Sequence, residues 1–558
     1  MRRRRISVVA ALFLIICCFT VGGLVFNHIA AAQGLMAQMN LFSAVLRLVK
    51  TYYVDEVDTD KLVDNAIKGM LGTLDPHTHL IPPKQYEDMD ERMIRGSYEG
   101  IGIAFDIVNG YLTVISPIEG SPSDMLGIRA GDKIVKIDDE SALGITTDEV
   151  FEKLRGPKGT SVHVSIRREG ERELLDFKII RDEIKIKSIP SAFMIRPGVG
   201  YIRMSRFART TGQDLETALD SLETQGMDRL ILDLRGNAGG FLSQAVEIAD
   251  KFVPKGNEIV YTKGRHEKAE EHYYSTEEAT HAMYPLIVMI DRGSASASEI
   301  VSGAVQDLDR GLVVGQPSYG KGLVENQMKL KDGSVLMLTV GRWYTPSGRL
   351  IQKPYTESYH PDIDEESDTT TAADSSEVLP VFTTISGREV FGGGGIKPDI
   401  ELDRDERYNS FVNSLERGNY FFDFAAVFVG EHDMTNDFDT FLGQFEVTDE
   451  IYLQFRDFLE EKDFHFENDT FLKGVTVDDF IIDDIKALLA EKKDKYLATH
   501  FENNKLYIQY AIKREIAKVL WGLEEWYVIF VNSDPQVMAA LDLFPEAEDL
   551  MAESKMIR

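Results

Sequence analysis

The chain has 558 residues, and its 92 acidic and 61 basic side chains give a formal net charge of −31. Its length predicts about three or four folded units, and so acidic a chain is a poor general binder of nucleic acid, which needs a basic surface. The two cysteines, Cys17 and Cys18, lie in the first apolar run. The rest of the chain therefore excludes a disulfide scaffold, a thiolate zinc site and a cysteine nucleophile.

Residues 1–33 have the pattern of an export signal or a membrane anchor. Four arginines precede the uncharged apolar run Ile6–Phe26, and three alanines at positions 30–32 follow it. This order is typical of a secretory signal, but the run is also long enough to span a bilayer. Cleaved signal and retained anchor both stay open. Either one predicts an exported protein, periplasmic or otherwise extracytoplasmic, with membrane contact through this segment if it is uncleaved.

Apolar residues recur at helical spacing through the next segment, 34–95, which predicts an N-terminal helical segment. Over 96–183 the pattern changes to short alternating strands separated by turns, which predicts a small β domain with two short helices near Ser123–Leu126 and Asp148–Leu154. The strands are expected at Gly102–Ile107, Leu112–Ile115, Lys133–Ile137, Ser161–Arg167 and Leu174–Ile180.

Strands and helices alternate over 184–402. The strands are expected at Gly200–Met204, Leu230–Leu234 and Leu286–Ile290, and the helices at Asp214–Thr224, Leu242–Phe252 and Ala297–Leu308. Alternation of this kind predicts an α/β core with a largely parallel sheet. Within this segment, Ile363–Val378 is acidic and rich in Ser and Thr, and we expect a surface loop there.

The last segment, 403–558, is acidic, aromatic and mostly helical in period, as in Ile485–Lys493 and Lys505–Trp526. It carries no catalytic motif. A helical docking or oligomerisation domain is the expectation.

The densest candidate cluster is Gly293–Glu299, which contains three serines and follows the apolar strand Leu286–Ile290. A serine at a strand-to-helix turn exposes its hydroxyl where helix N–H groups are unpaired. This position suits a nucleophile and an oxyanion. Ordinary helix N-capping explains the serines equally well.

Gly315–Gly322 resembles a phosphate-binding loop, but Gly322 replaces the hydroxyl that binds magnesium, and strands follow it where a helix is needed. We favour Lys321 as a general base for Ser296. A lysine has an ordinary pKa of about 10.4, so it acts as a base only where its surroundings favour the neutral amine. A solvated surface lysine is the alternative.

Two glycine loops complete the candidates. Asp233–Gly240 follows the expected strand Leu230–Leu234, and paired glycines allow close backbone approach to a ligand. Tyr98–Ile103 precedes the first strand of the β domain, where free N–H groups can capture a peptide carboxylate. Plain glycine turns explain each loop when it is taken alone.

Together these segments resemble the C-terminal processing peptidases, or tail-specific proteases, which are Ser/Lys serine peptidases with a PDZ domain. The resemblance runs from about Tyr52 to Leu402. The segments that carry it are Tyr53–Asp55, Leu74–His77, Tyr98–Ile103, Leu154–Thr160, Asp233–Gly240, Gly293–Ile300, Gly320–Val324, Tyr344–Arg349 and Gly395–Asp399.

The resemblance implies a multidomain α/β protein with a crotonase/ClpP-like peptidase core, into which a PDZ β domain is inserted. It further implies a role for each matching residue. Ser296 is the nucleophile and Lys321 the general base, while the backbone N–H groups of Gly240 and Ala297 form the oxyanion hole. Residues Gly100, Ile101, Gly102 and Ile103 receive the carboxylate of the substrate tail. The implied boundaries are 96–183 for the PDZ domain and 184–402 for the core.

One position departs from the family pattern. Four residues after Lys321 the family has Gln, which orients the lysine, whereas this chain has Glu325. A carboxylate that reaches the amine favours the charged lysine, which opposes general-base catalysis. Three hypotheses stay open. Glu325 points away, it is protonated in the closed site, or the enzyme rests inactive until substrate rearranges it.

We expect a serine endopeptidase that recognises the apolar C-terminal tails of exported proteins and needs no cofactor or metal. A homodimer is expected from the family. The alternative is a PDZ scaffold on a weak or inactive peptidase core, and Glu325 is the residue that favours it. A nucleotide-dependent ATPase would depend on Gly315–Gly322 alone.

Overall fold

A computed structural model gives the architecture of most of the chain. The predicted export signal or anchor at 1–33, the acidic segment Ile363–Val378 and the helix Ile485–Lys493 lie outside the described residues. Within the described part, no helix combines the length and apolarity needed to cross a bilayer. The described residues are 34–354, 379–466 and 497–554, with gaps at 109, 169–170, 172, 277–280, 404, 406, 408, 435–436, 463 and 465.

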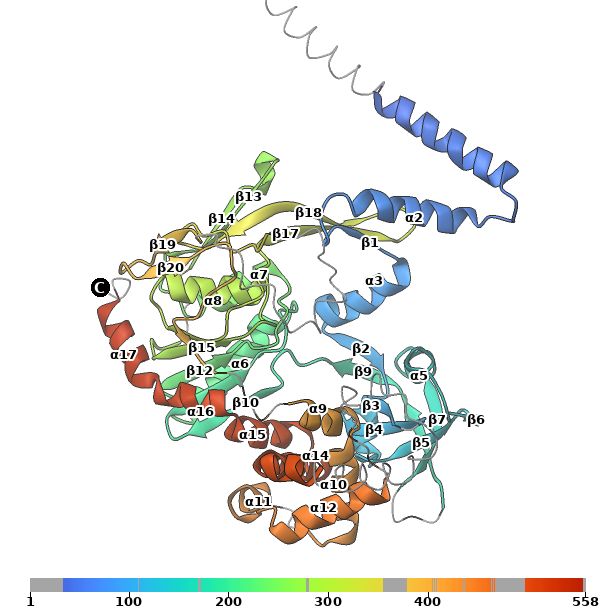
Figure 1. The fold of residues 1–558 in the computed structure, drawn as a ribbon, viewed down its shortest axis with the longest axis vertical. Coiled ribbons are helices and arrows are strands. Elements are labelled where there is room, and N and C mark those ends of the chain that lie inside the picture. Colours follow the sequence, from blue (N-terminus) through green and yellow to red (C-terminus); the bar gives the residue numbers. More distant parts are fainter. Residues whose placement is uncertain are drawn as a thin grey trace, which may run out of the picture. The chain divides into compact units, whose positions relative to one another are not determined.

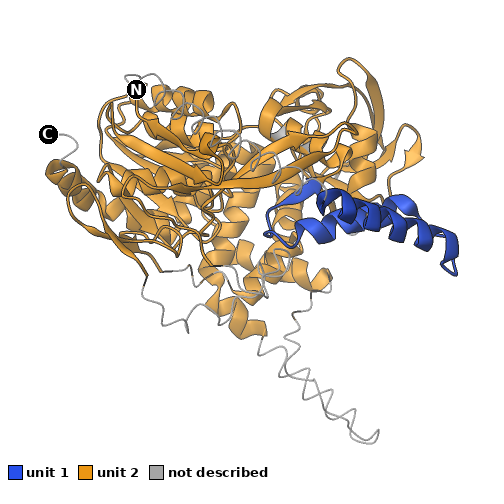
Figure 2. Cartoon of the chain, turned by 90° about the horizontal axis from the view of Figure 1, so that it is seen from above, with its two compact units in different colours: residues 1–80 blue, residues 81–558 orange. Residues whose placement is uncertain are grey.

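The chain divides into two compact units, residues 1–80 and residues 81–558 (Figure 2). In the first unit, residues 34–52 form a helix, and a second helix, α2, spans Thr59–Leu71. The Asp58 side chain caps α2 by accepting hydrogen bonds from the N–H groups of Asp60 and Lys61, which otherwise have no partner at a helix start. The helical spacing predicted for this segment is confirmed.

The second unit begins with helix α3 (Pro83–Met89) and the π-helix η1 (Asp90–Arg95), and then forms the predicted β domain. Its antiparallel sheet has the order β3-β4-β5-β7-β8 around an aliphatic core. A capping box between Thr146 and Glu149 starts α5. The elements are β2 (Ser97–Gly100), β3 (Ile103–Val108), β4 (Tyr111–Pro117), α4 (Pro122–Met125), β5 (Lys133–Ile137), β6 (Glu140–Ser141), α5 (Thr147–Leu154), β7 (Ser161–Arg167), β8 (Leu175–Ile180) and β9 (Asp182–Lys185).

A six-stranded sheet forms the α/β core, in the order β10-β11-β12-β15-β16-β21. All neighbouring strands pair in parallel except β10, which is antiparallel to β11. The predicted parallel α/β core is confirmed, and β15 has the predicted bounds. The strands are β10 (Ser191–Arg196), β11 (Val199–Arg203), β12 (Arg229–Asp233), β15 (Leu286–Ile290), β16 (Leu312–Gly315) and β21 (Ile400–Glu401).

Helices cover both faces of this sheet. Along β12, Leu230 and Leu232 pack against α6 (Thr211–Thr224), α7 (Leu242–Asp250) and α8 (Ala297–Asp307), because successive strand residues point to opposite faces. Ile231 points the other way, toward α16 (Pro535–Asp542) and α17 (Phe544–Glu553). Figure 1 shows this three-layer arrangement. The last helices of the chain therefore complete the α/β core, a placement that helical period alone does not reveal.

A second, antiparallel sheet brings strands to the candidate site. It contains β17 and β18, which are the strands expected after Gly322. It also contains the hairpin β13–β14, which was not predicted. Later in the chain, two short strands, β19 and β20, pair with each other. The bounds are β1 (His79–Ile81), β13 (Glu258–Gly264), the 3₁₀ turn η2 (Glu267–Ala269), β14 (Glu271–Tyr274), β17 (Leu323–Lys329), β18 (Val335–Tyr344), β19 (Val381–Thr383) and β20 (Glu389–Phe391).

The C-terminal segment is mostly helical, as expected, and packs around an aromatic core. The prediction of a single helix over Lys505–Trp526 is wrong, because the helix is interrupted at Gly522. That residue has φ +118°, which glycine adopts easily and other residues do not. The helices are α9 (Ser410–Arg417), α10 (Tyr420–Glu431), α11 (Phe438–Gln444), α12 (Asp449–Glu461), α14 (Lys505–Leu520) and α15 (Leu523–Ser533).

Candidate active site

Ser296 occupies the turn between β15 and α8, where it is the N-cap of the helix. Its φ is +52° and its ψ −109°, a strained conformation for a residue with a Cβ. The neighbouring serines have structural partners, because Ser294 Oγ donates to the carbonyl of Leu234 and Ser298 Oγ to that of Asn237. Of the three serines, only Ser296 is partly exposed.

Glu299, in the first turn of α8, fixes the backbones of both candidate catalytic residues. Its Oε2 accepts hydrogen bonds from the N–H of Ser296 at 2.8 Å and the N–H of Lys321 at 2.9 Å. Its Oε1 accepts from the Ser318 hydroxyl at 2.5 Å and the N–H of Gly320 at 2.7 Å. Burial raises the pKa of Glu299, and the four hydrogen bonds oppose that effect.

The sequence analysis gave Glu299 no role. The pattern that could have found it is the Ser-x-x-Glu spacing of Ser296 and Glu299, which is typical of a capping box. The bonds to the Lys321 loop could not be predicted, because they join residues 22 positions apart.

Lys321 stands just before β17 and forms an ion pair with Glu325, whose Oε1 lies 2.8 Å from Lys321 Nζ. The Lys321 side chain is 23% exposed and that of Glu325 15%. The register of β17 against β18 shifts between Val324 and Glu325, and such a bulge re-aims the side chains beside it. The hypothesis that Glu325 points away is therefore wrong in this structure.

The glycine loop after β12 lies against the start of α8. A Cβ on Gly239 would stand 2.9 Å from the nitrogen of Ala297, and a Cβ on Gly240 would stand 2.2 Å from the carbonyl oxygen of Phe207. Glycine is needed at both positions, because φ is also positive there, +95° and +151°. No described residue accepts a hydrogen bond from the N–H of Gly240 or Ala297, as an oxyanion hole requires.

Asp233 anchors the root of this loop. Its buried carboxylate accepts hydrogen bonds from Tyr201 Oη at 2.7 Å, Arg203 Nη1 at 2.9 Å and Arg235 Nη2 at 2.6 Å. Burial opposes ionisation, but the two guanidinium groups outweigh it and hold the pKa of Asp233 well below its usual range. The loop therefore begins from a rigid, charged anchor.

A cavity of about 960 Å³ brings the candidate catalytic residues together. Ser296, Lys321, Glu325 and Gly240 all line it. Ala297 is fully buried beside it and could contribute only its backbone N–H. Most of the remaining wall is apolar and includes Met89, Met93, Phe241, Leu323, Met337 and Trp343.

The predicted carboxylate-binding residues, Gly100–Ile103, lie elsewhere, from the last residue of β2 to the first residue of β3. Ser123 Oγ donates to the carbonyl of Ile101 and Ser121 Oγ to that of Gly102. Because a peptide unit is planar and trans, the N–H groups that follow those two carbonyls point the opposite way.

A second cavity of about 960 Å³ is lined by Ile101, Gly102 and Ile103, but not by Gly100. Its walls come from β3, from α5 through Phe151 and Leu154, and from the turn between α14 and α15 at Trp521. The structure thus places the predicted catalytic residues and the predicted carboxylate-binding residues at two different cavities.

Four family models match parts of the chain. Peptidase family S41 is the one that covers Ser296 and Lys321, and the others cover flanking segments. The matches are peptidase family S41 at 198–364, PDZ domain at 113–168, "probable PDZ-protease, C-terminal helical domain" at 411–544, and "activating protease CtpB N-terminal domain" at 27–81.

Named relatives extend the similarity across more than half of the chain. A carboxy-terminal-processing protease of Bartonella bacilliformis is 38% identical over 324 residues, which are 57% of this chain and 74% of that protein. The carboxy-terminal processing protease CtpB of Bacillus subtilis is 36% identical over 318 residues, 56% of this chain and 66% of that protein. Among solved structures, a photosystem II D1 C-terminal processing protease is 25% identical with a TM-score of 0.33, covering 65% of this chain and 92% of that chain.

Proposed function

Because the chain belongs to the carboxy-terminal processing proteases of peptidase family S41 and is a serine-type endopeptidase, we propose that it works through a Ser296–Lys321 dyad on polypeptides held by their C-terminal tails. The observation that carries this proposal is the shared anchoring of the two residues. Both line one cavity, and both backbones bind the same buried carboxylate, that of Glu299.

The reaction uses the groups that line this cavity. Neutral Lys321 takes the proton of Ser296 as Oγ attacks the carbonyl carbon of the scissile bond. The N–H groups of Gly240 and Ala297 stabilise the oxyanion that forms. The amine product leaves with the proton from Lys321, and an acyl ester remains on Ser296. Water then attacks the ester and gives a proton to Lys321, and the ester bond breaks as Lys321 passes that proton to Ser296 Oγ, which releases the acid and restores both residues.

Glu325 sets the resting state of this machinery. An ammonium group 2.8 Å from a carboxylate is stabilised in its charged form, and a charged lysine cannot accept the serine proton. Two of the three hypotheses remain: Glu325 is protonated when the enzyme works, or substrate binding separates the pair. The same ion pair is the observation that favours the second candidate function, a PDZ scaffold with weak or no activity.

The proposed recognition of substrate tails depends on the second cavity, the one lined by Ile101, Gly102 and Ile103. Its wall offers apolar side chains of β3 and α5, including Ile103, Phe105 and Leu154. The N–H groups of Gly102 and Ile103 are the proposed ligands of a terminal carboxylate, which such domains capture together with an added strand. The preferred ligand is therefore a protein tail that ends in apolar residues with a free carboxylate.

We also propose where in the cell the enzyme is located. The basic and apolar residues at 1–26 support an exported protein, periplasmic or otherwise extracytoplasmic, with membrane contact if the segment is retained. Fractionation of cells with the full chain tests this proposal, because intact export places the protein outside the cytoplasmic fraction. A homodimer is proposed from the family resemblance, and light scattering of the purified full chain tests it.

One experiment separates the two candidate functions. The full chain is incubated with an unfolded polypeptide that ends in apolar residues, and with the same polypeptide carrying a C-terminal amide. Binding is measured by fluorescence anisotropy and products by mass spectrometry. Cleavage of the free acid and slower cleavage of the amide support the tail-directed peptidase. If the free acid binds tightly but is not cleaved at any pH tested, the result would support the scaffold.

A further inference from the structure

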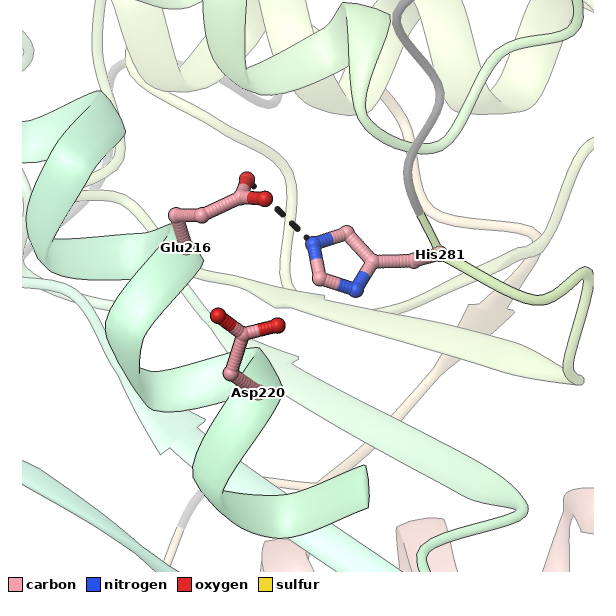
Figure 3. Close-up of side chains that lie close together, drawn as sticks. All are labelled: Glu216, Asp220 and His281. Atoms are coloured by element: carbon pink, nitrogen blue, oxygen red, sulfur yellow. Dashed lines mark ion pairs between the residues drawn. The ribbon is translucent and has the colours of Figure 1, made fainter. Parts of the chain in front are cut away.

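A cluster of ionisable side chains lies on α6 and the segment before β15, outside both cavities. Glu216 and Asp220 are four residues apart on α6, so their side chains share one face of the helix. His281 faces them from the segment between β14 and β15, and Figure 3 shows the three side chains converging. One ligand atom from each residue can be chosen so that all lie within 4.8 Å of one another.

His281 is oriented like a metal-binding histidine. Its side chain is 1% exposed, and Nδ1 lies 3.0 Å from Glu223 Oε1 while Nε2 lies 3.3 Å from Glu216 Oε2. Nε2 forms no hydrogen bond with any residue that the structure describes. A carboxylate on one ring nitrogen holds the proton there and leaves the lone pair on the other, the arrangement that zinc-bound histidines show.

A second buried polar atom lacks a partner beside the same carboxylates. Tyr284 is 4% exposed, and within the described residues its Oη has no hydrogen-bond partner. Burial, and after it the carboxylate of Glu223, raises the pKa of this tyrosine. Buried polar atoms without a protein partner are rare in folded proteins and require an explanation such as a bound ion or water.

The charges around the cluster leave room for a cation. Three carboxylates contribute −3, those of Glu216, Asp220 and Glu223, and the only ammonium in contact among the described residues is Lys251 Nζ, on Glu216 Oε2. With a neutral imidazole the sum is −2, which one divalent cation balances.

We propose that Glu216, Asp220 and His281 bind a divalent cation of the zinc class. One imidazole nitrogen and two carboxylate oxygens suit Zn²⁺, with water as a fourth ligand. Ca²⁺ and Mg²⁺ prefer oxygen ligands alone and more of them. The cation fastens the segment before β15 to α6, so its role is structural, and the proposal is independent of the proposed peptidase function.

Calorimetric titration of the full chain with Zn²⁺, after removal of metal with a chelator, tests the proposal. We expect one tight equivalent. Asp220→Asn, which changes an exposed side chain, weakens this binding at least about tenfold, as does His281→Gln. Glu223→Gln weakens it about 10- to 100-fold, the usual effect of removing a partner of a metal-bound histidine. His272→Gln is the matched control, since His272 pairs with Glu258 on the β13–β14 hairpin, and it leaves the titration unchanged.

Two results would overturn the proposal. If Asp220→Asn and His281→Gln both titrate like the wild type, Zn²⁺ binds elsewhere on the chain. If the wild type takes up no tight equivalent, Glu216, Asp220 and His281 do not form a metal site. The Tm provides a check on folding. Zn²⁺ raises the Tm of the wild type and of His272→Gln, and raises that of Asp220→Asn by less at the same Zn²⁺ concentration.

Discussion

Lys321 and Glu325 form an ion pair in which Nζ lies 2.8 Å from Oε1, with both side chains more than three quarters buried. Two opposite charges at this separation attract by about 6 kcal/mol at an effective dielectric constant of about 20. The general base proposed for Ser296 is therefore engaged by a neighbouring carboxylate in this structure.

Replacing Glu325 with Gln should release the base. Removal of a carboxylate next to the amine makes the neutral lysine easier to form, so activity rises at lower pH. We expect the rising limb of the kcat/KM profile to move toward acid, because an adjacent opposite charge has been removed. The measurement is peptide hydrolysis from pH 5 to pH 10.

The matched control is Glu401→Gln. Lys397 and Glu401 have the same spacing in the chain, but their atoms are 3.6 Å apart and both side chains are more than half exposed. This control should leave the pH profile unmoved. An identical profile for Glu325→Gln and the wild type would sink the idea that the ion pair restrains catalysis.

Glu299→Gln should impair catalysis without weakening substrate binding. An amide presents an NH₂ group where the carboxylate accepted backbone N–H bonds, so the turns of Ser296 and Lys321 lose their common anchor. We expect kcat to fall about 100-fold, the scale of a small misplacement of reacting groups, while KM for a tail peptide stays within a factor of about two. Steady-state kinetics measure both.

The comparison variant is Glu149→Gln. Glu149 occupies the same position in an exposed capping box at the start of α5, so it reports what the loss of a capping carboxylate does by itself. Equal kcat losses in the two variants would show that Glu299 does not position the catalytic residues.

Gly102→Ala should damage tail recognition. The added methyl would lie 2.2 Å from Ser121 Cβ, and φ at this position is +78°, so the loop that offers its N–H groups must move. Losing one hydrogen bond to a carboxylate costs about 1.5–3 kcal/mol, which is about 10- to 100-fold in affinity. Anisotropy with a free-acid tail peptide measures this loss. Gly110→Ala has a similar φ but open space around the methyl, and it should bind normally.

Protonation of Asp233 should make the free energy of unfolding depend on pH in the acid range. The folded carboxyl has a pKa below its usual range, whereas in the unfolded chain it takes up a proton near pH 3.9. As pH falls through that value the unfolded state gains a proton that the folded state refuses, so stability falls. Asp233→Asn removes this dependence and leaves two buried guanidinium groups with fewer partners. We expect about 3–5 kcal/mol less stability at pH 7.

The Tm from pH 6 to pH 3 checks the Asp233 prediction. The Tm of the variant starts lower and declines less steeply than that of the wild type. Parallel declines would contradict the assignment of this proton uptake to Asp233.

Patterns within one element could be predicted well from the sequence. The apolar run of β15 gave its bounds, and the alternation around it gave the parallel sheet, because strand and helix periods are local properties. Local signals failed where a single residue breaks a period. Gly522 ends α14 although the apolar pattern continues past it.

Contacts between distant residues could not be predicted. The bonds from Glu299 to the Lys321 loop, and the approach of His281 to Glu216 across 65 positions, depend on how the layers pack. The direction of Glu325 is a third case. Its identity was visible as a departure from the family, but a strand bulge decides where it points. The residues of the candidate site were therefore available from sequence, and their mutual geometry was not.

The most direct test of the Ser296–Lys321 dyad is cleavage of an unfolded, apolar-tailed protein by the full chain beside its Ser296→Ala and Lys321→Ala variants. Products are identified by mass spectrometry, with Ser294→Ala as a control that removes a structural hydroxyl. We expect cleavage by the wild type and Ser294→Ala, and a loss of at least about 1,000-fold in both dyad variants. Undiminished cleavage by Ser296→Ala or by Lys321→Ala would contradict the account.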